Sequence, residues 1–202
     1  MIGTVLQFVT RQINLDICRR LQVDPGQRKM VLASHVSPDG TFGGAEENVL
    51  LLCLAGVRRD AVAKRMPGVP DARVPVAGGP PGPAYVNRQP PVHLNLQLII
   101  AANFRGEQMP AGLDMLSMAI LMLQAHPVWD ALRFPDMPEG VGDLAFEMET
   151  LSYQEQSHLW GAIGAKYMPS VVYKMRMLTL EDLSVESVVP GVRTVDNRRV
   201  SG

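Results

Sequence analysis

The chain of 202 residues carries 19 Lys and Arg against 20 Asp and Glu, for a net charge of -1, and 47% of its residues are hydrophobic. This much apolar side chain supplies the core of one ordinary domain and excludes a globally disordered chain. The near-neutral balance lacks the excess of Lys and Arg that is typical of nucleic-acid-binding proteins. The 16 prolines and 18 glycines predict long loops.

The charges are divided unevenly along the chain. Residues 1–90 hold 11 Lys and Arg against 7 Asp and Glu, whereas residues 91–202 hold 8 against 13. Opposed charges suit head-to-tail self-association, in which the positive face of one subunit meets the negative face of the next. The alternative interpretation is two solvated surfaces without a partner.

The two cysteines, Cys18 and Cys53, lie in apolar stretches and predict small buried residues in a reducing compartment. The N-terminus has no charged stretch ahead of an apolar run and no small-residue cleavage site, so no secretory signal is expected. The most apolar segment, residues 113–128, is interrupted by polar residues and falls short of the roughly 20 residues that span a bilayer. Direct membrane insertion is therefore not expected.

The first 60 residues predict one helix followed by two strands. Apolar residues recur every four positions from Val5 to Leu21, which indicates an amphipathic helix of about five turns. A turn signal at residues 24–26 ends it. Residues 29–36 predict a short strand. The continuous apolar run at residues 48–57 favours a strand buried on both faces, with a buried helix as the alternative.

Residues 66–91 interrupt this pattern with eight prolines, which are too many for a regular element. The segment therefore predicts a long exposed excursion. A flexible surface insertion, a lid over a pocket and a contact with another protein are the three interpretations of it.

The second half alternates strands with helices. Strands are predicted at residues 92–104, 144–148 and 171–180, and helices at residues 111–125 and 153–163. The first of these helices is apolar on nearly all sides, so its own domain or a neighbouring subunit must cover it. The second has a capping box at Ser152 and Glu155 and ends at Gly164. Together the elements predict an α/β (α+β) fold, with a mixed sheet packed with three main helices.

These elements place one domain at residues 1–181, with the loop 66–91 inside it. Residues 182–202 have no periodicity and predict a C-terminal extension that projects from the domain as a contact arm.

The residues assemble no catalytic or metal-binding set. The histidines fall on four separate elements: His35, His93, His126 and His158. Neither cysteine has the close partner that zinc sites use, and the glycines of residues 161–166 are too closely spaced for a phosphate loop and close a helix instead of opening one. We therefore expect no cofactor and no metal.

Nine of the 12 methionines lie between Met109 and Met177. Met115, Met118 and Met122 repeat at helical spacing. A methionine face can mark an adaptable interface, although such a stripe also suits an ordinary core. These three residues are interface candidates.

Two segments carry a resemblance to a known family. They are QPPVHLNLQLIIAANF at residues 89–104 and LSYQEQSHLWGAIGAKYMPSVVYKMRMLT at residues 151–179. They resemble the cap or terminator proteins of contractile injection systems, the phage-tail-like particles typified by the Photorhabdus virulence cassette and the antifeeding prophage. The resemblance covers residues 1–181.

The resemblance implies a phage tail-terminator-like fold and a structural role without enzyme activity. Such proteins form a homohexameric ring that ends the inner tube and the sheath at the end away from the baseplate and couples the two. The implied partners are other copies of the chain, the tube protein and the sheath protein, and the implied location is the cytoplasm during assembly and then the particle. The alternative is a monomeric small-ligand-binding domain or an unrecognised enzyme that uses residues 66–91 as a lid.

Roles for individual residues follow from the same resemblance. The motif residues predicted to fix the fold are Trp160 as a large anchor, Gly161 and Gly164 for close packing, Lys166 after a helix end, Pro169 to stop the helix, and Tyr173. The tail residues Val185, Val188 and Val189 are expected to add a strand to the exposed edge of an adjacent sheath subunit.

Overall fold

A computed structural model describes residues 1–33, 35–36, 39–43, 47–60, 84–87, 92–180 and 187–190. The chain forms two compact units. The first combines Met1–Asp60 with His93–Leu180, and the second contains the short strands β5 (Ala84–Asn87) and β10 (Ser187–Pro190). The predicted boundaries at residues 181 and 182 stay a prediction.

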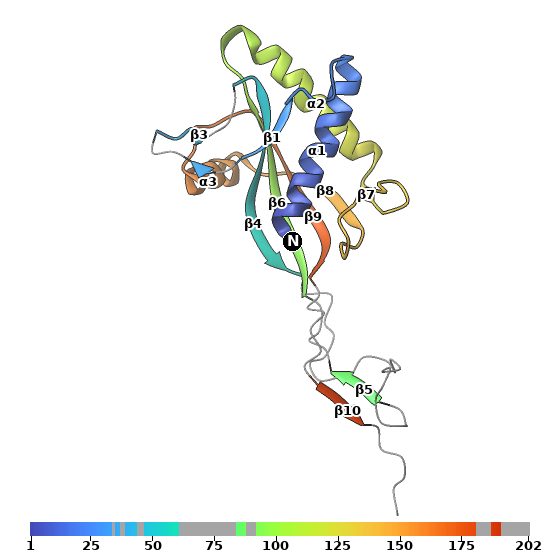
Figure 1. Cartoon of the computed structure of the whole chain (residues 1–202). Coiled ribbons are helices and arrows are strands. Elements are labelled where there is room, and N and C mark those ends of the chain that lie inside the picture. The colour runs from blue at the N-terminus through green and yellow to red at the C-terminus, as the bar shows by residue number, and fades with distance from the viewer. Residues whose placement is uncertain are drawn as a thin grey trace, which may run out of the picture. The chain divides into compact units, whose positions relative to one another are not determined.

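The first unit contains three helices and a six-stranded sheet (Figure 1). The helices are α1 (Ile2–Leu21), α2 (Met109–Ala125) and α3 (Tyr153–Ile163), with a 3-10 turn, η1 (Gly106–Gln108), ahead of α2. In spatial order the strands are β1 (Met30–Leu32), β4 (Val49–Arg59), β6 (Val92–Asn103), β9 (Ser170–Leu180), β8 (Leu144–Glu149) and β7 (Val128–Trp129). A separate antiparallel pair joins β2 (His35–Val36) to β3 (Phe42–Gly43).

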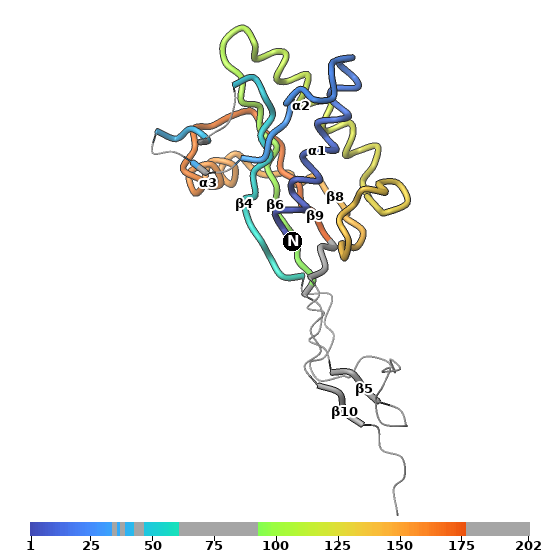
Figure 2. The backbone as a smooth tube through the Cα atoms, viewed as in Figure 1, coloured from blue at the N-terminus to red at the C-terminus, as the bar shows by residue number. Residues whose placement is uncertain are grey.

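The sheet is mixed. β1 runs parallel to β4, whereas the pairs β4–β6, β8–β9 and β7–β8 are antiparallel. β4 and β6 pair from Val49 opposite Asn103 to Arg59 opposite Leu94, and Figure 2 shows the two strands as neighbouring traces. The predicted fold class, a mixed sheet with three main helices, is confirmed.

Helices cover both faces of this sheet. Leu50 and Leu52 of β4 pack in one core with Ile13 of α1, whereas Leu51 between them packs in a second core with Trp160 of α3. Successive side chains of a strand point to opposite faces, so α1 and α2 lie on one face and α3 on the other (Figure 1). This explains the apolar run from Val49 to Cys53, whereas the predicted burial on both faces is wrong for Leu54 and Val57, which are 39% and 47% exposed.

The helix limits follow from the local sequence. Ile13 and Ile17 of α1 are fully buried, as the four-residue periodicity predicts, and Gln22 ends the helix in the left-handed conformation with φ 56°. In α3 the side chain of Ser152 accepts a hydrogen bond from the backbone of Glu155, which completes the predicted capping box. In return, the backbone N–H and the hydroxyl of Ser152 donate hydrogen bonds to the carboxylate of Glu155, and these two bonds lower the pKa of Glu155.

Several short strands differ from the prediction. Residues 29–36 divide into β1 and β2, and Val128–Trp129 forms β7, which no pattern indicated. The expectation that residues 66–91 hold no regular element is wrong at β5, since the proline-free stretch Ala84–Asn87 pairs in antiparallel fashion with β10. Both strands contain β-forming residues, and they meet across about 100 residues of sequence.

Among the described residues, no helix combines the length and the apolar character that crossing a membrane requires.

Both cysteines are free and buried, as predicted. Burial raises the pKa of Cys53 to about 12 and also raises that of Cys18. At pH 8, therefore, only a fraction on the order of 10⁻⁴ of the Cys53 side chains would be in the reactive thiolate form.

We expect a thiol reagent to label neither cysteine in the native protein at pH 8 and to label both after unfolding in guanidinium chloride. Rapid labelling of the native protein would contradict the burial of these side chains.

Candidate functional site

The methionine stripe of α2 lies mostly in the core. Met115 and Met122 are each 5% exposed, and Met118 is partly buried against the same core. The outward side of the helix carries Leu113 and Leu121 instead, which are 43% and 56% exposed. The structure therefore favours the core interpretation of the stripe, and an interface on α2 would use the two leucines.

The motif at residues 160–173 contributes side chains to both cores. Trp160 is 4% exposed and its ring lies 5.9 Å from that of Tyr167, so its predicted role as an anchor agrees with its burial. Tyr173 is 3% exposed and packs in the opposite core, where burial raises the pKa of its hydroxyl. Neither the indole N–H of Trp160 nor the hydroxyl of Tyr173 has a hydrogen-bond partner among the described residues.

Two roles predicted within this motif are wrong. A Cβ atom at Gly161 or at Gly164 would meet no atom within 4 Å, so neither glycine serves close packing. Gly164 instead supplies the left-handed conformation, φ 76°, that ends α3. The helix has therefore ended five residues before Pro169, whose carbonyl accepts a 2.9 Å hydrogen bond from the amide of Ala102 and fixes β9 beside β6.

Lys166 follows the end of α3, as predicted, and its amide donates a 2.9 Å hydrogen bond to the carbonyl of Gly40. It borders a cavity of about 450 Å³. Arg105 and Glu47 form a 3.1 Å ion pair in the lining of this cavity. Nearby, hydrogen bonds from Thr41 lower the pKa of Asp39. The described lining thus carries two acids, Asp39 and Glu47, and two bases, Arg105 and Lys166. These groups could form hydrogen bonds and ion pairs with a ligand or a partner segment.

Two of the three tail residues predicted to contact the sheath lie in the described part of the chain. Val188 and Val189 lie in β10, in register with Val86 and Tyr85 of β5. Val185 lies outside the described residues. The described part of the tail thus forms one strand of a two-stranded ribbon.

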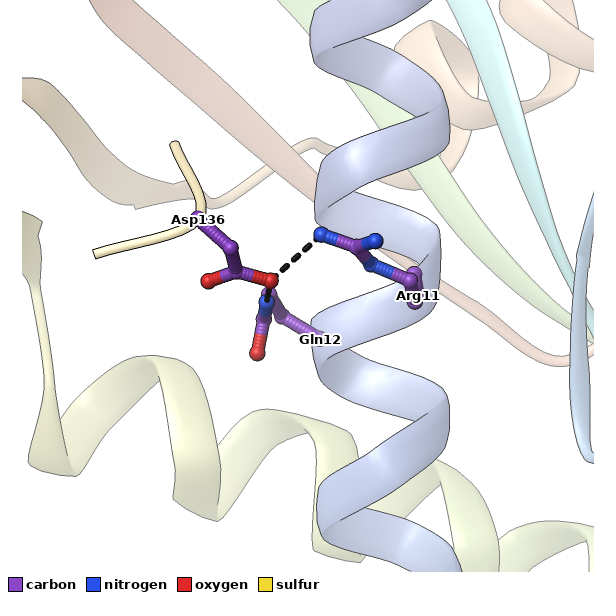
Figure 3. A network of polar contacts seen from close by, with 3 residues as sticks. All are labelled: Arg11, Gln12 and Asp136. Atoms are coloured by element: carbon purple, nitrogen blue, oxygen red, sulfur yellow. Dashed lines mark hydrogen bonds and ion pairs between the residues drawn. The ribbon is translucent and has the colours of Figure 1, made fainter. Parts of the chain in front are cut away.

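A polar network fixes the loop between β7 and β8 to α1. Figure 3 shows Arg11 and Gln12 of α1 directed at the carboxylate of Asp136, with an ion pair from Arg11 and a 2.8 Å hydrogen bond from Gln12. Phe134 in the same loop stacks on Trp129 with ring centroids 4.6 Å apart. The loop is therefore attached to α1 through Asp136 and to the core through the ring of Phe134.

We expect Asp136→Asn to lower the free energy of unfolding by about 0.2–1 kcal/mol, because the ion pair is more than half exposed and screened by water. Urea unfolding at low and high salt measures the effect, which should shrink at 1 M NaCl. Glu139→Gln is the matched control, since it removes an exposed acid from the same loop. Equal losses for the two variants would contradict a role for the network.

No group of three or more His, Cys, Asp or Glu side chains that could hold a metal ion occurs in the described part of the chain. The features that stand out are an α/β framework with exposed apolar helix and strand positions, and a ribbon made from two distant segments. These features offer surfaces for contact with other chains.

The chain belongs to the family of the Pvc16 N-terminal domain, whose model matches residues 5–194. This confirms the resemblance drawn from residues 89–104 and 151–179. The match extends past residue 181 and includes the β10 segment.

The fold is similar to that of the sheath/tube terminator of PVC, an extracellular contractile injection system, solved in the extended state. The TM-score is 0.59 at 10% sequence identity, and the likeness covers 96% of this chain and 63% of the other. The chain thus spans less than two thirds of the length of that terminator. No curated protein matches it.

Proposed function

We propose that this chain is a sheath/tube terminator of a contractile injection system. In this role it forms a homohexameric ring that ends the inner tube and the sheath at the end away from the baseplate and couples them. The observation that carries the proposal is the family match over residues 5–194, and the likeness in fold to a protein described as a sheath/tube terminator supports it. The role is structural and uses no catalytic group or cofactor.

The two units suit different parts of this task. The first unit has two well-packed cores on either side of one sheet, which gives a ring a rigid subunit. The second unit contains a ribbon of two four-residue strands. A two-stranded ribbon is marginally stable in water, so a third strand from a partner would stabilise it. We assign this ribbon, with the tail beyond residue 181, to contact with the sheath.

The partners proposed are further copies of the chain, the tube protein and the sheath protein. Nucleic acid and direct membrane insertion have no part in the proposal. The protein would assemble in the cytoplasm and then remain in the particle. Because the chain spans 63% of the similar terminator, a longer terminator has room for contacts beyond those assigned to this chain.

Electron microscopy of purified tubes with added chain tests the proposal. A tagged chain should bind only at the tube end away from the baseplate and give a ring-shaped density there. A variant truncated after residue 181 should still bind tubes, while losing affinity for sheathed particles. Failure of the full chain to bind any tube end would overturn the proposal.

A small-ligand-binding domain is the second candidate, and the 450 Å³ cavity beside Lys166 is the observation that favours it. The predicted lid, residues 66–91, lies outside the described residues except at β5. A protein with this function should bind a small ligand in the cavity, lose that binding in Lys166→Ala, and attach to no tube end. Attachment to tube ends that is unchanged in Lys166→Ala would favour the terminator.

A further inference from the structure

Both edges of the six-stranded sheet are only partly covered by the short strands that flank them. β1 pairs with β4 only at Leu50–Leu52. The outer side of β4 from Leu54 to Arg59 therefore has no strand partner among the described residues. An open edge of this length is a template for association with another chain.

A β-bulge turns apolar side chains of this open edge to one face. Leu54 lies opposite Leu98, and Val57 lies opposite Leu96. β4 advances by three residues between these pairs while β6 advances by two, so β4 contains one extra residue. Since Leu96 and Leu98 are two apart and share a face, Leu54 and Val57 share it as well. They are 39% and 47% exposed, so the edge presents two apolar side chains to solvent.

The opposite edge of the sheet is open in the same way. β7 pairs with β8 only at Leu144 and Ala145, and the carbonyl of Pro127 binds the amide of Phe146. Beyond that point, Glu147–Glu149 has no partner on its outer side within the described ranges. Met148 in this stretch is 43% exposed.

The two edges carry opposite charge, because the strand order separates the two halves of the chain. β1 and β4 come from the basic N-terminal half and form one edge, whereas β8 and β7 come from the acidic half and form the other. Residues 16–33 and 49–60 hold six Lys and Arg against three Asp, and residues 126–151 hold six Asp and Glu against one Arg. Arg11 and Arg176 pair with Asp136 and Glu147, and the side-chain amide of Gln97 donates a 2.8 Å hydrogen bond to Glu149. Since the hydrogen bond adds no charge, the second edge remains acidic.

We infer that the β4 edge of one copy, with Leu54, Val57, Arg58 and Arg59, binds the β8 edge of a second copy, with Glu147, Met148 and Glu149. The two surfaces differ, so the contact is head-to-tail and can repeat around a closed ring. Apolar side chains lie at the centre of each surface and complementary charges beside them. This inference rests on the proposed terminator role and names the interface between its subunits.

Charge reversal gives a test with an internal rescue. R58E/R59E makes the contact residues of both edges acidic, and E147K/E149K makes the contact residues of both edges basic. Each variant alone should assemble at least about tenfold more weakly than the unchanged chain, because like charges meet at every contact. An equimolar mixture should assemble again, since acidic and basic subunits can alternate around a ring. Mass photometry over a concentration series measures all three samples.

Two controls separate folding from assembly. E107K/D114K reverses two exposed acids, one in η1 and one in α2, that belong to neither proposed surface, and should leave assembly unchanged. Thermal melting detects any variant that fails to fold, for instance through loss of the ion pair between Glu147 and Arg176. Misfolded variants would not recover on mixing, so recovery supports the inference directly.

A mixture that stays monomeric while the unchanged chain assembles would overturn this interface and leave the terminator proposal intact. A chain that is monomeric at every concentration would also overturn the inference. The terminator proposal would then be decided separately, by binding to tube ends in electron microscopy.

Discussion

Trp129→Ala is expected to lower the free energy of unfolding by about 3–5 kcal/mol, which is a large part of the stability of an ordinary domain. The side chain is 0% exposed. Its ring centroid lies 6.0 Å from that of Phe8, 4.6 Å from that of Phe134 and 4.8 Å from that of Phe146. Its indole N–H donates a 2.9 Å hydrogen bond to the carbonyl of His126. The substitution therefore removes a core aromatic group and leaves one acceptor unpaired.

Urea unfolding monitored by circular dichroism measures this loss. Leu132→Ala is the control from the same region, since Leu132 is 94% exposed and its truncation should change the stability by no more than about 0.5 kcal/mol. Similar losses at the two positions would mean that Trp129 does not occupy the core.

Gly112→Ala is expected to destabilise the protein by about 1–3 kcal/mol, although alanine favours helices more than glycine does. A Cβ atom at this position of α2 would lie 2.4 Å from Cδ2 and 3.0 Å from Cβ of Phe104. Phe104 is 7% exposed and held in the core, so it cannot move aside without disturbing its neighbours. The clash therefore outweighs the gain in helix propensity.

Gly161→Ala in α3 is the matched control for Gly112→Ala. No atom lies within 4 Å of the added Cβ there, so helix propensity alone acts and should stabilise the protein by up to about 1 kcal/mol. The two substitutions should shift the melting temperature in opposite directions. A stabilising Gly112→Ala would contradict the close approach of α2 to Phe104.

Elements with a strong local pattern could be predicted from the sequence. The four-residue periodicity from Val5 to Leu21 corresponds to α1, and the capping box at Ser152 together with Gly164 gave both limits of α3. In each case the physical cause is local, because periodicity and caps involve residues within a few turns of one another.

Features that depend on distant partners could not be predicted. β5 and β10 form because they pair with each other, and β7 has only two residues. Gly161 and Gly112 are both helical glycines, and only the position of Phe104 tells them apart. The uneven charge was visible in the sequence, but its separation onto two sheet edges depends on the strand order, which local patterns do not specify.

The length distribution of particles assembled with and without this chain tests the central claim most directly. Tube, sheath and baseplate proteins should give particles of uniform length, with a ring at the end away from the baseplate, when the chain is present. Without it, the tube and sheath should end raggedly and vary in length. Particles with the same lengths and the same intact ends in its absence would contradict the role of terminator.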